Sequence, residues 1–344
     1  MKAVVIHPPH ELRVEDTALG EIGPGQVAVR IRAGGICGSD LHYYRHGGFG
    51  AVRVKEPMVL GHEVAGEVLA VAPDVGRVKV GDRVAVNPSR PCGRCRYCAE
   101  RLFNHCENMR FYGSAMPFPH IQGAFRETLV CDASQCEIGP PGISFELLAL
   151  CEPLSVVLHG IGRAAPPAGR RVLGTGWGPI GGLAVAALRH GGAAEIVATD
   201  VAAEPLSVAT RLGADRTIDV AAEPEALAAY AAGKGTFDLL VECSGNGEAI
   251  RGAIPTLRPR GAIVQLGIAG GDVALPLNTI VSKELALLGS FRFHEEFATA
   301  AKLIGSGALD LSPLLTGTYP VDQAIAAFEL AGDRRRAMKV HLAF

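Results

Sequence analysis

The chain has 344 residues, enough for about two domains, and its 48% hydrophobic and 20% charged residues indicate a folded, globular protein. The formal net charge of −2 at pH 7 disfavours a nucleic-acid-binding protein, because phosphate contacts require a basic surface. No uninterrupted apolar run approaches the roughly 18 residues of a membrane span, and the N-terminal sequence lacks the long apolar core of a signal peptide. We therefore expect a cytoplasmic protein that binds neither membranes nor nucleic acid.

The first part of the chain, residues 1–146, is rich in short apolar segments and turns. Gln26–Ile31 and Arg83–Val86 are apolar runs of strand length, and each follows a turn sequence, Ile22–Gly25 and Val80–Asp82 respectively. This spacing predicts a small β-barrel or β-sandwich.

Beyond residue 146, strand-like apolar runs alternate with helical segments rich in Ala and Leu. Six strands are predicted, at Val172–Gly174, Ile196–Thr199, Thr217–Ile218, Asp238–Glu242, Ala262–Leu266 and Ala286–Gly289. Helices are predicted at Ile180–His190, Ala203–Leu212, Pro224–Ala232 and Glu248–Leu257. Alternation at a spacing of ~20–25 residues is typical of βαβ units, so this part predicts an α/β fold with a doubly wound parallel sheet.

A glycine-rich turn follows the first of these strands and opens a helix. Its pattern, Gly-x-Gly-x-x-Gly, allows a backbone to approach a pyrophosphate closely, and the helix N-terminus presents free N–H groups to the phosphates. The acid at the end of the next strand is suited to the ribose hydroxyls and repels a 2′-phosphate, which favours NAD over NADP. The residues expected to bind the cofactor are Gly176, Gly178, Pro179, Ile180, Gly181 and Asp200.

Four of the nine cysteines lie close together in the sequence, within residues 90–107. Two-residue spacers between the first three let successive thiolates converge on one ion, and four thiolates close a tetrahedral zinc site with no open position. An iron–sulfur cluster and a zinc module gripping nucleic acid are the alternatives, and the latter is disfavoured by the downstream fingerprint. The pattern predicts a structural zinc held by Cys92, Cys95, Cys98 and Cys106.

A second candidate metal site is dispersed along the chain. Cys37 lies in GGICGSD, His62 and Glu63 lie in GHEVAG, and Glu152 lies in CEP. Three protein ligands of mixed S, N and O type plus water describe a catalytic zinc. Taken alone, Cys37, His62 and Glu63 are each better explained by packing or solvation, and the sequence by itself does not show that they converge. Glu63 and Glu152 compete for the third ligand position, and the sequence does not rank them.

These motifs occur in the order found in one family. The strings GICGSD, GHEVAG, the four-cysteine segment, CEP and the glycine fingerprint resemble those of the zinc-containing medium-chain alcohol dehydrogenases along essentially the whole chain. Ala72 stands where the family usually has Gly. Glu152, where other members have Cys, is similar to the polyol dehydrogenase branch. The strings GICGSDLHYY, MRFYGSAMPFPH and GSFRF look closer still to the L-idonate 5-dehydrogenases.

The resemblance implies a fold and a reaction. We expect a GroES-like β-barrel catalytic domain at 1–146, a Rossmann NAD-binding domain at 147–289, and a return of 290–344 to the catalytic domain. We also expect one catalytic and one structural zinc per chain, and oxidation of L-idonate at C5 to 5-keto-D-gluconate by hydride transfer to NAD. The alternative is a sorbitol-, xylitol- or threonine-type dehydrogenase with the same chemistry. A homo-oligomer, dimer or tetramer, is expected by resemblance.

Residues for proton transfer and substrate binding are also expected. Ser39 and His42 follow Cys37 by two and five residues, and a relay would carry the alcohol proton from Ser39 through the cofactor ribose to His42 near solvent. A sugar acid needs a cation for its carboxylate, and Arg292 resembles the family's substrate-side arginine. Arg110, Arg45, Tyr43 and Tyr44 are further candidates for substrate contacts.

Overall fold

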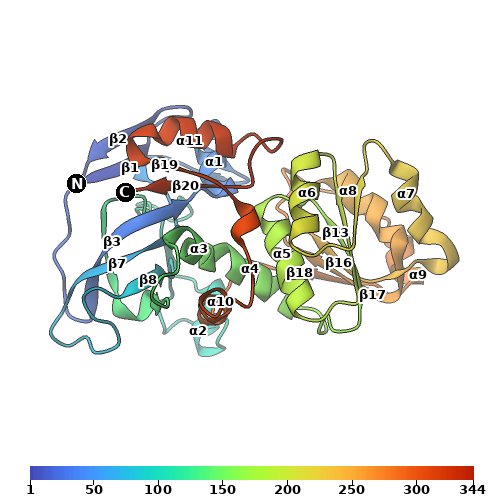
Figure 1. Cartoon of the computed structure of the whole chain (residues 1–344), viewed down its shortest axis with the longest axis horizontal. Coiled ribbons are helices and arrows are strands. Elements are labelled where there is room, and N and C mark those ends of the chain that lie inside the picture. The colour runs from blue at the N-terminus through green and yellow to red at the C-terminus, as the bar shows by residue number, and fades with distance from the viewer.

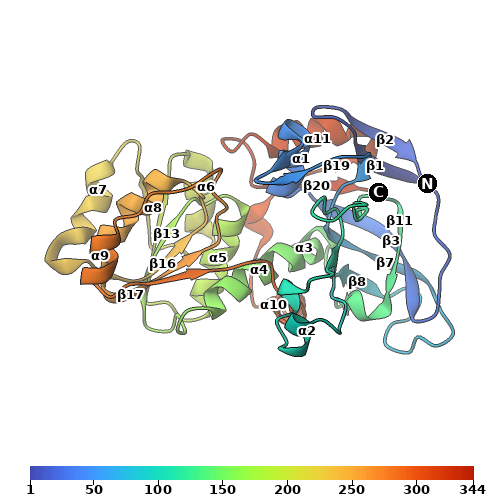
Figure 2. The same ribbon diagram turned by 180° about the vertical axis from the view of Figure 1, so that it is seen from behind.

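The computed structural model describes all 344 residues and has two lobes side by side. One lobe contains both chain ends and is built mainly of β-strands, whereas the other is a sheet covered by helices (Figures 1 and 2). No helix in either lobe combines the length and the apolar character that crossing a membrane requires.

The β-rich lobe is organised around a seven-stranded sheet. Its order is β12-β8-β7-β3-β20-β19, with β11 also paired to β3. These strands are β3 (Gln26–Gly35), β7 (Glu63–Val71), β8 (Arg83–Val86), β11 (Thr128–Asp132), β12 (Cys136–Ile138), β19 (Leu315–Pro320) and β20 (Lys339–Ala343). A second sheet has the order β2-β1-β6, formed by β1 (Lys2–Ile6), β2 (Leu12–Asp16) and β6 (Met58–Val59).

The C-terminal segment of the chain lies in this first lobe. β20 pairs antiparallel with β3, so that His341 lies opposite Gly35, and β19 pairs parallel with β20. Helix α11 (Ala324–Ala331) covers the same region (Figure 1). His341 and Leu342, near the end of the chain, therefore lie beside Gly35 and Gly34, where the GICGSD motif begins.

The second lobe contains the expected doubly wound sheet. Its six parallel strands follow the order 3-2-1-4-5-6 that is typical of dinucleotide-binding folds. In sequence order they are β13 (Arg171–Thr175), β14 (Glu195–Asp200), β15 (Arg216–Asp219), β16 (Phe237–Glu242), β17 (Leu257–Gln265) and β18 (Ala286–Gly289). The helices of this lobe are α5 (Pro179–His190), α6 (Ala203–Arg211), α7 (Pro224–Ala228), α8 (Gly247–Ala253) and α9 (Leu277–Ser282).

Two helices are shorter than the sequence pattern predicts. The helix expected at Glu248–Leu257 ends at Ala253, and β17 already begins at Leu257. Pro255 has no N–H to donate to the preceding turn, so the chain continues as a 3₁₀ turn before the strand. The helix expected at Pro224–Ala232 is regular only to Ala228 and then tightens to 3₁₀ geometry.

The two lobes are joined by a common apolar core. One cluster of 38 buried residues runs from the helices on the parallel sheet to the small residues Ala33, Ala65 and Ala85 of the β-rich lobe. The helices between the lobes are α3 (Phe145–Ala149), α4 (Cys151–Gly162) and α10 (Glu296–Gly305) (Figure 1). The first turn of α4, which begins at Cys151, therefore lies at the junction of the lobes.

Candidate active site and metal centres

The first ligand candidate, Cys37, immediately precedes helix α1 (Gly38–His46). Its backbone N–H donates to Oδ2 of Asp40 at 3.0 Å, and Oδ1 of the same carboxylate accepts the N–H of Gly61 at 3.3 Å. Asp40 is fully buried, and Nδ1 of His62 lies 3.9 Å from Oδ1. One carboxylate therefore fixes the Cys37 turn and the Gly61–His62 turn relative to each other, although they are far apart in sequence.

Glu63 begins strand β7 beside β3. It lies opposite Gly35 in the register, and a Cβ at Gly35 would lie 2.4 Å from Oε2 of Glu63, so only glycine leaves room for this carboxylate. Nζ of Lys339 donates to both oxygens, at 2.6 and 2.9 Å, and to the carbonyl of Ile36 at 3.2 Å. The two charged side chains are only 3% and 1% exposed. They form a buried ion pair beside the candidate metal ligands.

Glu152 lies in the first turn of α4 and is buried. Burial raises the pKa of its carboxyl to about 8, and the neighbouring Glu63 acts in the same direction while His62 opposes it. Burial and the Glu63 carboxylate likewise raise the pKa of the Cys37 thiol to about 12. Several acidic groups thus face one another at the junction of the lobes, where a cation would favour their ionised forms.

The donor atoms fit a zinc ion. Ligand atoms of Cys37, His62 and Glu63 lie within 4.8 Å of one another, and Nδ1 of His62 is buried without a hydrogen-bond partner. Glu152 is outside this set but is close enough to interact electrostatically with all three. One sulfur, one imidazole and one carboxylate with space for a fourth ligand are typical of a catalytic zinc site.

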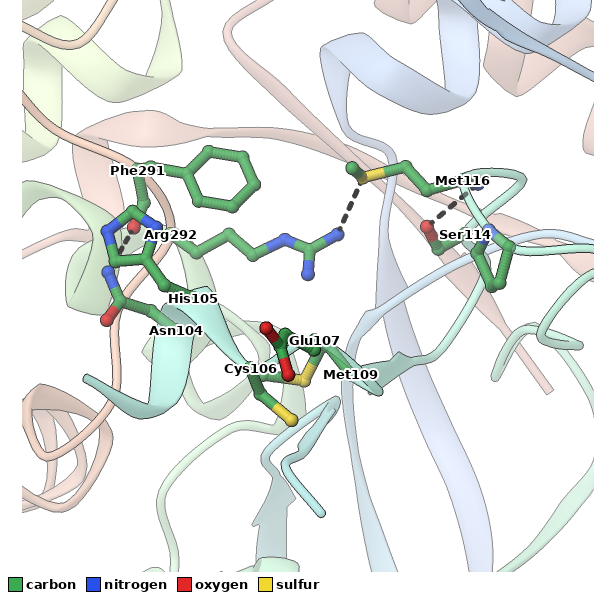
Figure 3. Close-up of a pocket in the computed structure, with 10 residues that line it drawn as sticks. Asn104, His105, Cys106, Glu107, Met109, Ser114, Met116, Phe291 and Arg292 are labelled. Atoms are coloured by element: carbon green, nitrogen blue, oxygen red, sulfur yellow. Dashed lines mark hydrogen bonds between the residues drawn. The ribbon is translucent and has the colours of Figure 1, made fainter. Parts of the chain in front are cut away.

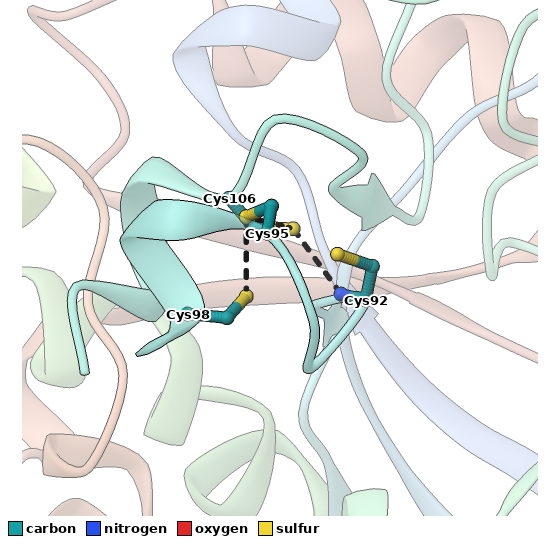
Figure 4. A group of neighbouring side chains, drawn as sticks. All are labelled: Cys92, Cys95, Cys98 and Cys106. Carbon is teal, nitrogen blue, oxygen red and sulfur yellow. Dashed lines mark hydrogen bonds between the residues drawn. The ribbon is translucent and has the colours of Figure 1, made fainter. Parts of the chain in front are cut away.

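The four cysteines of the sequence cluster also converge in space. Their sulfurs all lie within 4.8 Å of one another, and those of Cys95 and Cys98 are 3.5 Å apart (Figure 4). Sulfurs bound tetrahedrally to zinc at about 2.3 Å are separated by about 3.8 Å, which matches this cluster. Backbone amides, that of Arg94 first, lower the pKa of Cys92 to about 6, whereas burial raises the pKa of Cys98 to about 12. The donor set is that of a closed structural zinc site.

The glycine fingerprint connects β13 to α5 as its pattern predicts. Gly176 has a φ of +78°, and a Cβ there would lie 2.5 Å from Ser244, so this position requires glycine. Pro179 and Ile180 form the first turn of α5 after Gly178, and Gly181 packs against the carbonyl of Gly176. Asp200 ends β14, and its Oδ2 accepts the N–H of Trp177 at 2.6 Å. The acid thus lies against the turn that opens α5.

The relay candidates lie on one face of α1. Ser39 and His42 are three residues apart, a spacing that places side chains next to each other on a helix. The Ser39 hydroxyl lies against the Cys37 sulfur and partly opposes the rise in its pKa, while His42 is largely exposed. Partial burial and the neighbouring His46 lower the pKa of His42. The serine therefore faces the ligand residues and the histidine faces solvent.

The candidate substrate residues are placed differently from one another. The hydroxyl of Tyr43 accepts the N–H of Ala115 at 3.1 Å, and its side chain is buried, so it anchors the loop after residue 113. The hydroxyl of Tyr44 donates to Glu329. Arg110 is exposed and lines a separate hollow with Cys92 at the four-cysteine lobe. Tyr43 nevertheless lies near the zinc candidates, because Cys37 and Arg292 are among the groups that act on the pKa of its hydroxyl. Tyr44 and Arg110 have no contact that places them there.

Arg292 is nearer to the candidate ligands. Its guanidinium lies 4.3 Å from the centre of the Phe111 ring, and that ring packs on His62 with centroids 5.5 Å apart. Its Nη2 donates to the sulfur of Met116, and it forms no ion pair with any carboxylate. Arg292 also has a φ of +54°, which an arginine rarely adopts. It lines a hollow of about 360 Å³ with Asn104, His105, Met116 and Phe291 (Figure 3).

Sequence reasoning assigned no role to Asp40 or Lys339. Asp40 is part of the quoted GICGSD string, and an acid three residues after a helix start is a recognisable capping signal. Lys339 is 276 residues from Glu63, and its only signal in the sequence was that a lysine in an apolar C-terminal strand needs a buried partner. Both side chains act indirectly, by holding candidate zinc ligands in place: Asp40 holds the turns of Cys37 and His62, and Lys339 holds Glu63.

Comparison with known proteins places this geometry in a family. Residues 23–140 match the alcohol dehydrogenase GroES-like domain, and residues 179–306 match the zinc-binding dehydrogenase family. The chain is 42% identical over 316 residues to L-idonate 5-dehydrogenase (NAD(P)(+)) of Escherichia coli K12, covering 92% of this chain and 91% of that protein. It is 34% identical to sorbitol dehydrogenase of Bacillus subtilis, covering 96% and 93% respectively.

A solved structure agrees with the sequence comparison. The crystal structure of the Escherichia coli L-idonate 5-dehydrogenase superposes with a TM-score of 0.95 at 39% identity, covering all of this chain and 98% of the other. The GroES-like and Rossmann folds implied by the resemblance are therefore confirmed. The chain belongs to the zinc-containing medium-chain alcohol dehydrogenases, in their polyol dehydrogenase branch.

Proposed function

We propose that this dehydrogenase oxidises L-idonate at C5 to 5-keto-D-gluconate, with NAD as the preferred hydride acceptor. Arg292 is the observation that supports a sugar acid over a neutral polyol. Its guanidinium is partly buried and forms no ion pair within the chain, although the buried Glu152 carboxyl is near enough to act on its pKa, and the Phe111 ring separates it from His62. A partly buried arginine that forms no ion pair is suited to a two-point hydrogen bond with a substrate carboxylate.

The residues of the zinc site would divide the work between them. Cys37, His62 and Glu63 would hold the catalytic zinc, and Glu152 would orient a water molecule or the substrate hydroxyls. Zinc held there would lower the pKa of an alcohol hydroxyl, and NAD bound at the glycine turn would supply the hydride acceptor. Ser39 would take the hydroxyl proton, and His42 would release it to solvent. The closed cysteine cluster would bind the second zinc, which has no role in the reaction.

The preference for NAD is proposed from Asp200. Its carboxylate ends β14 at the glycine turn, where it would accept hydrogen bonds from the adenosine ribose. No Arg or Lys lies between Asp200 and Val208 to neutralise a 2′-phosphate. The name of the Escherichia coli relative includes both coenzymes. The ratio of kcat/KM for NAD to that for NADP, measured on this chain, tests the preference.

The substrate proposal is tested by NAD reduction with two matched substrates. L-iditol carries a neutral CH₂OH where L-idonate carries its carboxylate, so the pair isolates the charged group. We expect Arg292→Met to raise KM for L-idonate by about 10- to 100-fold, the range for losing hydrogen bonds between charged groups, and to change L-iditol turnover little. Arg110→Met, at the exposed first residue of the two-residue strand β10 (Arg110–Phe111), is the control and should change neither.

Two results would contradict this proposal. If the wild type turns over sorbitol, xylitol or threonine but not L-idonate, the alternative substrates are correct and the enzyme class is unaffected. If Arg292→Met impairs both matched substrates equally, the arginine does not bind the carboxylate.

Oligomerisation and location belong to the same proposal. The edge strand β18 is largely exposed, with Leu287 46% exposed, and such an edge can pair with a second copy. Light scattering would distinguish a dimer from a tetramer, and a monomer would contradict the proposal.

A cytoplasmic location is proposed because the cysteine cluster binds metal only while its thiols stay reduced.

A further inference from the structure

A buried carboxylate lies at the end of β16, in the middle of the parallel sheet. Glu242 is the last residue of this strand and is fully buried. The neighbours of β16 are β13 and β17 (Figure 1), and the boundary between β13 and β16 is where the strand order reverses. Ligands of doubly wound folds bind outside the carboxyl ends of the strands at this point. Glu242 therefore lies beneath the expected dinucleotide site.

Every hydrogen-bond partner of this carboxylate is a neutral donor. The N–H of Ser244 donates to Oε1 at 2.7 Å, and the Ser244 hydroxyl donates to the same oxygen. The N–H of Gly245 lies 3.1 Å from both oxygens, the Thr175 hydroxyl donates at 3.3 Å, and Nε2 of Gln265 donates to Oε2 at 2.5 Å. No lysine or arginine pairs with Glu242. The buried group therefore organises polar atoms and does not form an ion pair.

These donors come from the ends of three adjacent strands. Thr175 ends β13 directly before the glycine fingerprint, the Ser244–Gly245 turn follows β16, and Gln265 ends β17. The fingerprint rests on this arrangement, because a Cβ at Gly176 would lie 2.5 Å from Ser244. On its other side, the turn is held by the N–H of Trp177 on Asp200. The pyrophosphate-binding turn is thus held between two carboxylates.

We propose that Glu242 is a positioning residue for the dinucleotide site, which sets the fingerprint turn by fixing the Ser244–Gly245 turn against it. The inference rests on the proposed use of NAD at this site. Glu242 touches the turns rather than the ligand, so its loss should weaken cofactor binding through a displaced Gly176. The donors demand an acceptor on each oxygen, and a Gln side chain would put an N–H₂ group against Gln265 or Ser244.

The test compares acid-to-amide changes at the two ends of the same strand. Asp238 lies near the start of β16, where it accepts hydrogen bonds from the N–H of Arg171 and from the Arg258 side chain. This is the amino end of the parallel strands, opposite the dinucleotide site. Glu242→Gln and Asp238→Asn therefore each disturb a bonded carboxylate of β16, and only one of them is beside the fingerprint. Calorimetric titration of the zinc-loaded full chain with NADH measures the dissociation constant. Emission of Trp177, the only tryptophan, reports the turn itself.

We expect Glu242→Gln to raise the dissociation constant for NADH by about 10- to 100-fold and to shift Trp177 emission in the free protein. Asp238→Asn should leave the dissociation constant for NADH within about twofold of wild type and should not shift Trp177 emission, even where it lowers the melting temperature. Ser244→Ala removes one hydroxyl donor and should raise the dissociation constant by a smaller factor; it decides the matter if Glu242→Gln fails to fold. Unchanged NADH binding in folded Glu242→Gln, or in Ser244→Ala when that variant decides, would overturn the inference.

The same titration separates this inference from the proposed function. A zinc-loaded wild type that does not bind NADH would overturn both. A wild type that binds NADH, together with variants that weaken it equally at Glu242 and Asp238, would overturn only the positioning role, because the effect would then follow general stability.

Discussion

Removing the charge of Lys339 should destabilise the protein through its buried partner. Nζ of Lys339 lies 2.6 and 2.9 Å from the oxygens of Glu63, and neither side chain is more than 3% exposed. Truncating one member of a buried ion pair leaves an uncompensated charge and costs about 3–5 kcal/mol. For a chain of this length, that corresponds to a fall of roughly 4–7 °C in melting temperature.

The measurement is cleanest where no catalytic zinc compensates Glu63. We would therefore use a Cys37→Ser background, in which the four-cysteine cluster is intact, and follow thermal unfolding by calorimetry. Lys339→Met and Glu63→Gln should each lower the melting temperature by the amount given above. The combined variant should recover most of the loss, because no buried charge is then left without a partner.

The additivity of the two changes decides this reasoning. If the combined variant is destabilised by the sum of the single changes, the pair has no coupling and the buried contact does not act as an ion pair. A Lys339→Met variant that melts within about 1 °C of its parent would refute the estimate of its magnitude.

Three further outcomes are expected. Cys95→Ser should reduce the zinc content by one ion per chain and lower the melting temperature, because a structural zinc contributes folding free energy; elemental analysis that finds no loss would exclude a zinc in this cluster. Burial, followed by the Lys339 charge, lowers the pKa of His341 to about 3, so its contribution to stability is complete above pH ~6.5 and is lost as the pH falls toward 3. Urea titrations should therefore show His341→Leu losing about 2 kcal/mol less than wild type between pH 6.5 and 4.5, and parallel curves would contradict this. Asp200→Ser should raise kcat/KM for NADP relative to NAD by about 10-fold or more, whereas an unchanged ratio would show that this carboxylate does not select the coenzyme.

Much of the fold could be predicted because its signals are local. The strands at Arg83–Val86 and Ala286–Gly289 have the predicted bounds, since short apolar runs between turns leave the backbone few alternatives. The glycine fingerprint could also be predicted, because the turn at Gly176 needs a positive φ that glycine adopts readily, whatever the rest of the fold. Helix ends were less predictable: apolar spacing continued past Ala253, although Pro255 could not continue the helix.

The sequence by itself determined which chemical groups this protein has: two sets of zinc-ligand types, a phosphate-binding turn and an acid suited to a ribose. Only the tertiary structure decided which of them meet. It grouped Glu63 rather than Glu152 with Cys37 and His62, brought Lys339 across 276 residues to Glu63, and separated Arg110 from Arg292. The reason is physical: strand pairing and core packing join segments remote in sequence, and a residue's type carries no record of the partner it acquires.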